Sequence, residues 1–219
     1  FGLELLTIPT LALQIGLSSC NPGHVPKVNV TFNHDQIVYD LDTPHAELDK
    51  FDIDTESPYG PNVHTIITGL MQGPVHYAYS FKTGYSRHSK TGQICLWYDS
   101  VDVTITNKPK IYIAAEYKND PCRYRATLKH EMKHVAADKA VMRRYKAIFA
   151  AAVRDVMRTK GVIGPMAENL IPAKQAEMNA AIKTAMMKTL EEMDKERRVK
   201  QKKVDTKIEY DYIKSLCEL

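Results

Sequence analysis

The sequence lacks the ~18 uninterrupted apolar residues of a membrane-spanning helix, and it contains no repeat at a fixed period. An excess of charge of one sign is also lacking, because 30 basic residues stand against 26 acidic ones and leave no strong field to recruit polyanions. The densest basic run, residues 195–203, contains none of the aromatic side chains on which single-stranded nucleic acids stack. We therefore expect no membrane span and no nucleic-acid partner, and we interpret the basic run as a solvated helix face.

Cysteines are few, and none of them stands in a C-x-x-C pair. This absence argues against a cysteine zinc site or a thioredoxin-like motif. The cysteines are an even and dispersed set, namely Cys20, Cys95, Cys122 and Cys217, and such a set fits two disulfides. Disulfides indicate an oxidising compartment, so we expect a secreted or periplasmic protein; free thiols in a cytosolic protein are the alternative.

The N-terminal segment, residues 1–24, is apolar but has Glu4 and no basic start; a secretory leader needs a positive region, which would have to precede these residues. The sequence "LSSC" ending at Cys20 resembles the lipobox of bacterial lipoproteins, in which the cysteine is acylated after cleavage. A lipid anchor is therefore one interpretation of this segment. The one we favour is an amphipathic helix packed on the domain.

Runs of β-branched and aromatic residues, separated by turn residues, predict three or four antiparallel strands. The runs cover residues 25–35, 75–86, 92–106 and 110–117. The stretch 40–74 is rich in proline and glycine, which is typical of loops.

The second half of the chain has the character of helices. Residues 123–160 contain no glycine or proline, and a second helical stretch from Ala173 carries apolar residues at spacings of three and four. We expect the two to form an antiparallel helical hairpin, with residues 165–203 as a helical extension. From Glu191 the apolar stripe thins, so this end is expected to project into solvent or to touch a partner.

Within the first helix, the sequence "LKHEMKHVAADKA" contains His130, Glu131 and His134 in the order H-E-x-x-H. Residues four apart lie on one face of a helix, ~5.4 Å along its axis, so the two imidazoles can converge on one ion. Glu131 is turned away by ~100° and can reach a water on that ion without being a ligand. Catalytic zinc lowers the pKa of its bound water towards ~7, and Glu131 would accept the proton and deliver it to the leaving amine.

The motif alone is suggestive, because about 2 of 100 chains with this histidine and glutamate content would contain it by chance. The motif lies inside a predicted helix, and a helix is what places the two histidines on one face, as metal binding requires. We expect one α+β domain over residues 1–219, with a small antiparallel sheet packed on an H-E-x-x-H active-site helix. The long antiparallel helical hairpin follows on its C-terminal side.

The sequence resembles the zincin metallopeptidases, in which an upstream edge strand binds extended substrate beside an H-E-x-x-H helix. It is most similar to a bacterial family of predicted secreted zinc-dependent proteases. The similar stretches are "ICLWYDSVDVTIT", "IYIAAEY", "CRYRATLKHEMKHVAADKAV" and the tail "VDTKIEY…C", which together cover about residues 76–145 and the tail. The glycine of the metzincin extension H-x-x-G-x-x-H is absent, so a third zinc ligand has to come from elsewhere.

The resemblance implies Glu209 as that third ligand, because the family has an acidic residue in a similar D-T-x-x-E-Y tail. The alternative is that Glu209 completes a capping box with Thr206 at the start of a short last helix. Six other residues are the remaining candidates for the third ligand: Asp205, Glu168, Glu177, His64, His76 and His88.

Three further roles are expected with less support from the residues. Tyr210 either stabilises the oxyanion, as phenols do in several zincins, or is a buried tyrosine bonded to the backbone. Asp138 either accepts a hydrogen bond that orients His134 or is a surface carboxylate. The resemblance also implies the disulfides Cys95–Cys122 and Cys20–Cys217.

Two functions follow as expectations. The first is a secreted zinc-dependent peptidase that uses Zn²⁺ and a zinc-bound water activated by Glu131, with a protein or peptide as substrate. The second is a non-catalytic binding or structural protein on a zincin frame, which holds a partner with its helical hairpin. The presence of Glu131 beside two correctly spaced histidines favours the first. The oligomeric state, the substrate sequence and the biological role are not predicted.

Overall fold

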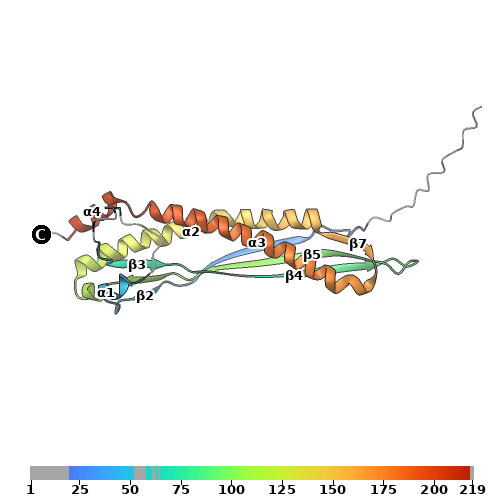
Figure 1. The fold of residues 1–219 in the computed structure, drawn as a ribbon, viewed down its shortest axis with the longest axis horizontal. Helices are drawn as coiled ribbons and strands as arrows, with labels where there is room; N and C mark the ends of the chain where they lie inside the picture. The colour runs from blue at the N-terminus through green and yellow to red at the C-terminus, as the bar shows by residue number, and fades with distance from the viewer. Residues whose placement is uncertain (1–19, 52–57, 61–62, 64, 218–219) are drawn as a thin grey trace, which may run out of the picture.

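The computed structural model describes residues 20–51, 58–60, 63 and 65–217. It is an elongated mixed α+β structure (Figure 1). Its elements are β1 (Lys27–His34), β2 (Val38–Asp40), α1 (His45–Leu48), β3 (Gly69–Gln72), β4 (Val75–Arg87), β5 (Ile94–Asn107), β6 (Lys110–Ile113), the 3-10 helix η1 (Ala115–Tyr117), α2 (Pro121–Lys160), β7 (Val162–Met166), the 3-10 helix η2 (Glu168–Leu170), α3 (Ile171–Lys202) and α4 (Lys207–Ser215). The amphipathic helix expected within residues 1–24 lies mainly outside the described residues.

The strands form two sheets, a longer one around β5 and a smaller one around β6. In the longer sheet β1 is parallel to β5, whereas β4 and β7 are antiparallel to it. In the smaller sheet β2 is parallel to β6 and β3 is antiparallel. The prediction of a purely antiparallel sheet is therefore wrong. Alternation of residue types indicates which face of a strand is buried, but it does not indicate the direction of the neighbouring strand.

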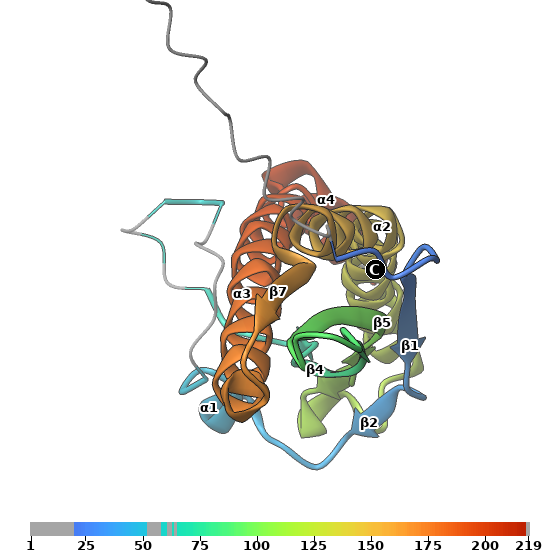
Figure 2. The ribbon, with the colours of Figure 1, turned by 90° about the vertical axis from the view of Figure 1, so that its right-hand side faces the viewer.

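The core lies between the longer sheet and the two long helices (Figure 2). Strand β5 buries alternate residues such as Val101, Val103 and Ile105, as expected for a strand with one face on the core. Helix α3 adds Met178 and Ile182 to the same cluster. One face of α3, within residues 165–203, is thus part of the core, and the link between α2 and α3 contains β7, which pairs with β5.

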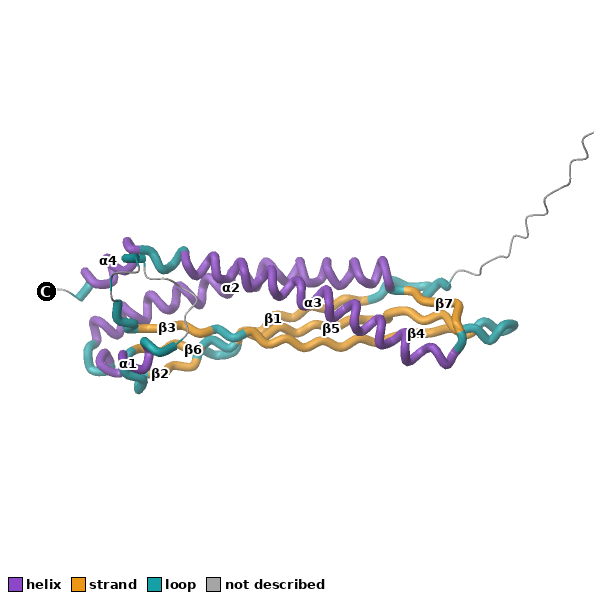
Figure 3. Tube along the Cα trace, viewed as in Figure 1, coloured by secondary structure: helices purple, strands orange, loops and turns teal. Residues whose placement is uncertain are grey.

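Helix α2 passes over both sheets, so its two halves have different neighbours (Figure 3). It begins at Pro121, where the Asp120 side chain accepts hydrogen bonds from the next two free backbone amides and acts as an N-cap. The first half packs on the smaller sheet, where Val135 joins Ile111 and Ile113 in a buried cluster. The second half packs on the longer sheet. The H-E-x-x-H residues lie on the first half, beside the smaller sheet.

Two disulfides form, as expected, but they are Cys20–Cys95 and Cys122–Cys217, so the predicted pairing is wrong. Cys95 lies near the start of β5, which pairs with β7 just after the end of α2. Cys122 lies at the other end of α2, and a helix of 40 residues spans ~60 Å. The disulfide of Cys20 also leaves no free sulfur for acylation, so a lipid anchor at this residue is not supported.

Among the described residues, no helix is both long enough and apolar enough to cross a bilayer. The two disulfides fit a protein of an oxidising compartment.

Candidate metal centre

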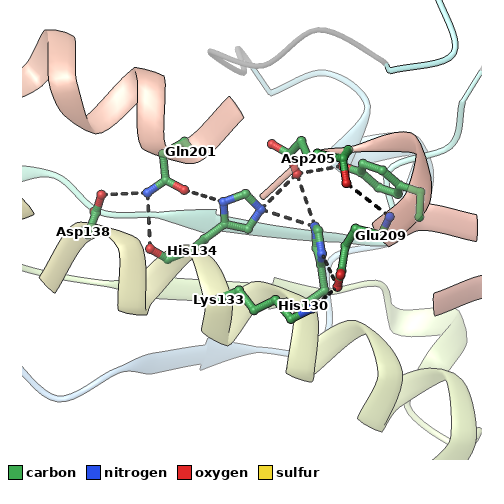
Figure 4. A network of polar contacts seen from close by, with 9 residues as sticks. His130, Lys133, His134, Asp138, Gln201, Asp205 and Glu209 are labelled. Atoms are coloured by element: carbon green, nitrogen blue, oxygen red, sulfur yellow. Dashed lines mark hydrogen bonds and ion pairs between the residues drawn. The ribbon is translucent and has the colours of Figure 1, made fainter. Parts of the chain in front are cut away.

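His130, His134 and Asp205 bring three donor atoms together at one buried point (Figure 4). The Nε2 atoms of the two histidines are 3.2 Å apart. Asp205 Oδ1 lies 3.0 Å from Nε2 of His134 and 3.3 Å from Nε2 of His130. The three atoms therefore form a nearly equilateral triangle. Asp205 was one of the open alternatives for the third ligand and was not the first choice.

Two elements supply this triangle. The histidines are one turn apart on α2, and Asp205 stands in the short link between α3 and α4. Each of the three residues is at most 9% exposed. The site therefore lies where the first half of α2 meets the end of α3.

The dimensions of the triangle test whether an ion fits. Tetrahedral zinc binds nitrogen and oxygen at ~2.0–2.2 Å, which places neighbouring donors roughly 3.3–3.5 Å apart. The donor separations of 3.0–3.3 Å are close to this geometry. A zinc ion therefore fits the donor set with a small outward movement of the side chains. The same donors also suit other divalent transition metals, so the geometry does not select the metal.

The charges at the site favour a cation. Burial on its own would lower the pKa of His134, but the hydrogen bond to Asp205 and the nearby Glu131 carboxylate raise it to about 9. Burial would raise the pKa of Asp205, yet hydrogen bonds from both histidines outweigh it and hold this pKa well below its usual range. Protons on His134 and a metal ion would compete for the same lone pair, so metal binding should weaken in acid.

The other ring nitrogen of His134 faces Gln201. Nδ1 of His134 is hydrogen-bonded to Oε1 of Gln201, which leaves Nε2 directed at the triangle. Gln201 in turn donates from Nε2 to Asp138 Oδ1 over 2.6 Å. Asp138 is fully buried, so it is not a surface carboxylate, and it reaches His134 only through Gln201.

Glu209 is outside the triangle, so the structure does not support it as the third ligand. It belongs to the first turn of α4, where its backbone N–H donates to Thr206 Oγ1 over 3.2 Å, so the Thr206 half of the expected capping box forms; the Thr206 N–H instead donates to the Val204 carbonyl. Its carboxylate accepts from Lys133 Nζ at 2.5 Å and lies 3.6 Å from Nδ1 of His130. The helix start turns Glu209 towards the outer side of the His130 ring, away from Nε2.

Glu131 is buried between α2 and the smaller sheet. A Cβ atom placed on Gly69 of β3 would stand 2.7 Å from its Oε1, so the carboxylate fits there only because residue 69 has no side chain. Burial raises the pKa of Glu131 to about 7, although the two histidines and a backbone hydrogen bond from Met71 lower it. The carboxylate can therefore bind and release a proton near neutral pH.

Tyr210 closes the site from α4. Its hydroxyl donates to Asp205 Oδ1 over 3.0 Å, and its ring centroid lies 5.2 Å from that of His130. The hydroxyl is thus hydrogen-bonded to the carboxylate of the triangle and not to the backbone. Burial, with the Asp205 charge, raises the pKa of this phenol, so it stays a hydrogen-bond donor.

The remaining candidates for the third ligand lie elsewhere. Glu168 pairs with Arg87, and Glu177 pairs with Lys174. His76 lies on β4 and His88 lies in the turn after it. His64 is outside the described residues.

Gln201 and Arg197 were not recognised in the sequence, because both stand in the basic run that was interpreted as a solvated face. Only their spacing of four, which places them on one face of a helix, was visible there.

No family model, curated protein or solved structure matched this chain in the comparisons that we made.

Proposed function

We propose that the protein is a zinc-dependent peptidase in which His130, His134 and Asp205 hold the ion. The observation that carries this proposal is the convergence of the three donor atoms within 3.3 Å of one another, beside a buried carboxylate that is not among them. An ion held only for structure needs closed ligation and no such neighbour, whereas hydrolysis needs a proton acceptor at the ion.

Zinc bound there would supply Lewis-acid chemistry, which acidifies a water molecule and polarises a peptide carbonyl. Glu131 is the residue that accepts the proton of that water and returns it to the leaving amine. The backbone hydrogen bond from Met71 and the close packing on Gly69 hold its carboxylate in one position. Tyr210 orients Asp205 through its hydroxyl, and an oxyanion role for this phenol requires that hydrogen bond to open.

Strand β3 is the element that would carry the substrate. It is the last strand of the smaller sheet and, among the described strands, pairs only with β6. An extended peptide can add to such an edge through main-chain hydrogen bonds. The sequence resemblance to zincins implies the same arrangement, although the strand expected there, residues 110–117, begins with β6 at the centre of this sheet.

The low exposure of the triangle favours one other function. Each of its residues is at most 9% exposed, so an ion there could hold α2 to the end of α3 without catalysis. This is a structural function with the metal as a clasp between elements, and it differs from the alternative expected from the sequence, in which the helical hairpin holds a partner.

The decisive experiment separates metal binding from hydrolysis. We expect about one zinc per chain by elemental analysis, removed by a chelator, together with cleavage of an unfolded protein or a peptide library. Glu131→Gln should retain the zinc and abolish cleavage, because it removes the proton acceptor and leaves the donors in place. Asp155→Asn, an exposed acidic residue of the same helix, is the matched control and should retain both. Zinc binding with equal cleavage by Glu131→Gln and its parent would overturn the role of Glu131, and no cleavage by the parent would favour the clasp.

A further inference from the structure

We infer that Gln201 is the positioning residue of the metal centre, and that Asp138 and Arg197 act on His134 through it. The inference rests on the proposed metal centre, and it adds residues that do not touch the ion. Figure 4 shows the central part of this relay, from Asp138 through Gln201 to His134.

The side-chain amide of Gln201 is held on both sides. Its Nε2 donates to Asp138 Oδ1 at 2.6 Å and to the His134 backbone carbonyl at 3.3 Å. A carboxylate only accepts, so the nitrogen of the amide has to face Asp138. The oxygen is thereby left for Nδ1 of His134, which must carry the proton of that hydrogen bond. Nε2 of His134 consequently presents its lone pair to the ion.

Arg197 fixes the other end of the relay. Its guanidinium donates to Asp138 from Nη2 at 2.7 Å and from Nε at 3.1 Å, a two-pronged contact with a fully buried carboxylate. This pair keeps Asp138 an acceptor with a fixed orientation. Arg197 and Gln201 are one turn apart on α3, so both project to the same side of that helix.

The relay also reaches the smaller sheet. Nη2 of Arg197 donates to the carbonyl of Gly73 at 2.6 Å, and Gly73 is the residue directly after β3. A Cβ atom at Gly73 would stand 2.7 Å from Asp138 Oδ2, so the chain approaches this closely only because residue 73 is glycine. The Arg197 guanidinium therefore has two effects. It orients Asp138, which holds Gln201 against His134, and it fixes the end of β3, the strand that packs beside Glu131.

The experiment measures zinc affinity by competition with a chromophoric chelator in single and double variants. Gln201→Leu should weaken zinc binding by roughly 10- to 100-fold, the usual loss when the partner of a metal-bound histidine is removed. Asp138→Asn should weaken it by less, because the amide oxygen still accepts from Gln201. In the Gln201→Leu background, Asp138→Asn should cause no further loss, because its effect reaches His134 only through Gln201.

The matched control is Glu196→Gln, which breaks the ion pair between α3 and Arg144 of α2 without touching the relay. It should leave zinc affinity within about 2-fold of the parent, although it removes a contact between the same two helices. Gln201→Leu that binds zinc as tightly as the parent would overturn the inference. So would losses that add in the double variant, because they would mean that Asp138 acts by holding the helices together.

A second measurement does not need the metal. In the metal-free protein, the Nδ1 proton of His134 should give a slowly exchanging resonance in ¹⁵N-edited NMR, absent in Gln201→Leu and present in Glu196→Gln. If the parent binds no zinc, the proposed function fails while this resonance still tests the relay. An Nδ1 resonance unchanged by Gln201→Leu would overturn the relay even where zinc binds.

Discussion

Asp205 Oδ1 lies 3.0 Å from Nε2 of His134, although 71 residues separate the two in the chain. Because this contact closes the donor triangle, Asp205→Asn should lower zinc affinity by at least about 100-fold, more than the loss of an outer partner. Glu209→Gln should lower it by less than about 10-fold, because Glu209 contacts only the outer side of His130. Zinc titration of the two variants distinguishes them, and equal losses would restore Glu209 as a ligand.

The buried carboxylate of Glu131 should make the metal-free protein less stable as the pH rises. Its pKa in the folded protein is about 7 against the ordinary 4.5 of an exposed glutamate, so the free-energy cost of ionising it in the fold grows between these pH values and is complete above pH 7. Glu131→Gln should therefore raise the free energy of unfolding at pH 8 by on the order of 3 kcal/mol, and should leave it unchanged at pH 4. Urea unfolding in the presence of a chelator measures both values; parallel pH profiles for the variant and the parent would contradict this assignment.

Gly69→Ala should destabilise the protein by about 1–3 kcal/mol, because its Cβ would stand 2.3 Å from Thr127 Cγ2 and 2.7 Å from the Glu131 carboxylate. Replacing Thr127 by serine removes the nearest atom, so the double variant should recover part of the loss. Thermal melts of the three proteins check this. A double variant no more stable than Gly69→Ala would place the strain elsewhere.

The two disulfides should differ in their effect on the metal centre. Removing either should cost roughly 4 kcal/mol of stability, because the residue separations of 75 and 95 are similar. Helix α4 buries no residue. The contacts of Tyr210 with Asp205 and His130 help to hold it, and Cys217 ties down the chain just after its end, so the Cys122→Ala and Cys217→Ala pair should also weaken zinc binding. The Cys20→Ala and Cys95→Ala pair is the control. Peptide mapping without reduction should first recover the two native pairs, and the opposite order of zinc affinities would contradict the role of α4.

The sequence predicted the helix that carries His130 and His134, because a long stretch without glycine or proline and with apolar periodicity has few other structures available. It also predicted the strand β5, whose buried and partly exposed residues alternate. These features are local. Asp205 could be named only as one of several candidates, because its distance from His134 depends on how the end of α3 packs on α2.

Gln201 and Arg197 were missed for a related reason. In the sequence they belong to a basic run whose residues resemble an exposed helix face. Of the two acidic partners of Arg197, only Asp194 is near in the sequence, whereas the buried one, Asp138, lies in a different helix. The predicted cysteine pairing was wrong for the same reason. Cys122 and Cys95 lie near opposite ends of the long helix α2, and this separation is not visible in the sequence. All three failures concern how distant elements pack together: the direction of neighbouring strands, the pairing of cysteines and the buried ion pair. Local sequence patterns do not determine such packing.

The distance in sequence between the histidines and Asp205 also orders events during synthesis. A chain grows from its N-terminus at about 5–20 residues per second, so His134 is made roughly 4–14 s before Asp205. Throughout that time a nascent chain has two of the donors and lacks the third, together with Gln201, which orients His134. The donor set is complete only after every strand and α2 have been made. A chain that ends before Asp205 therefore cannot assemble the three-donor site.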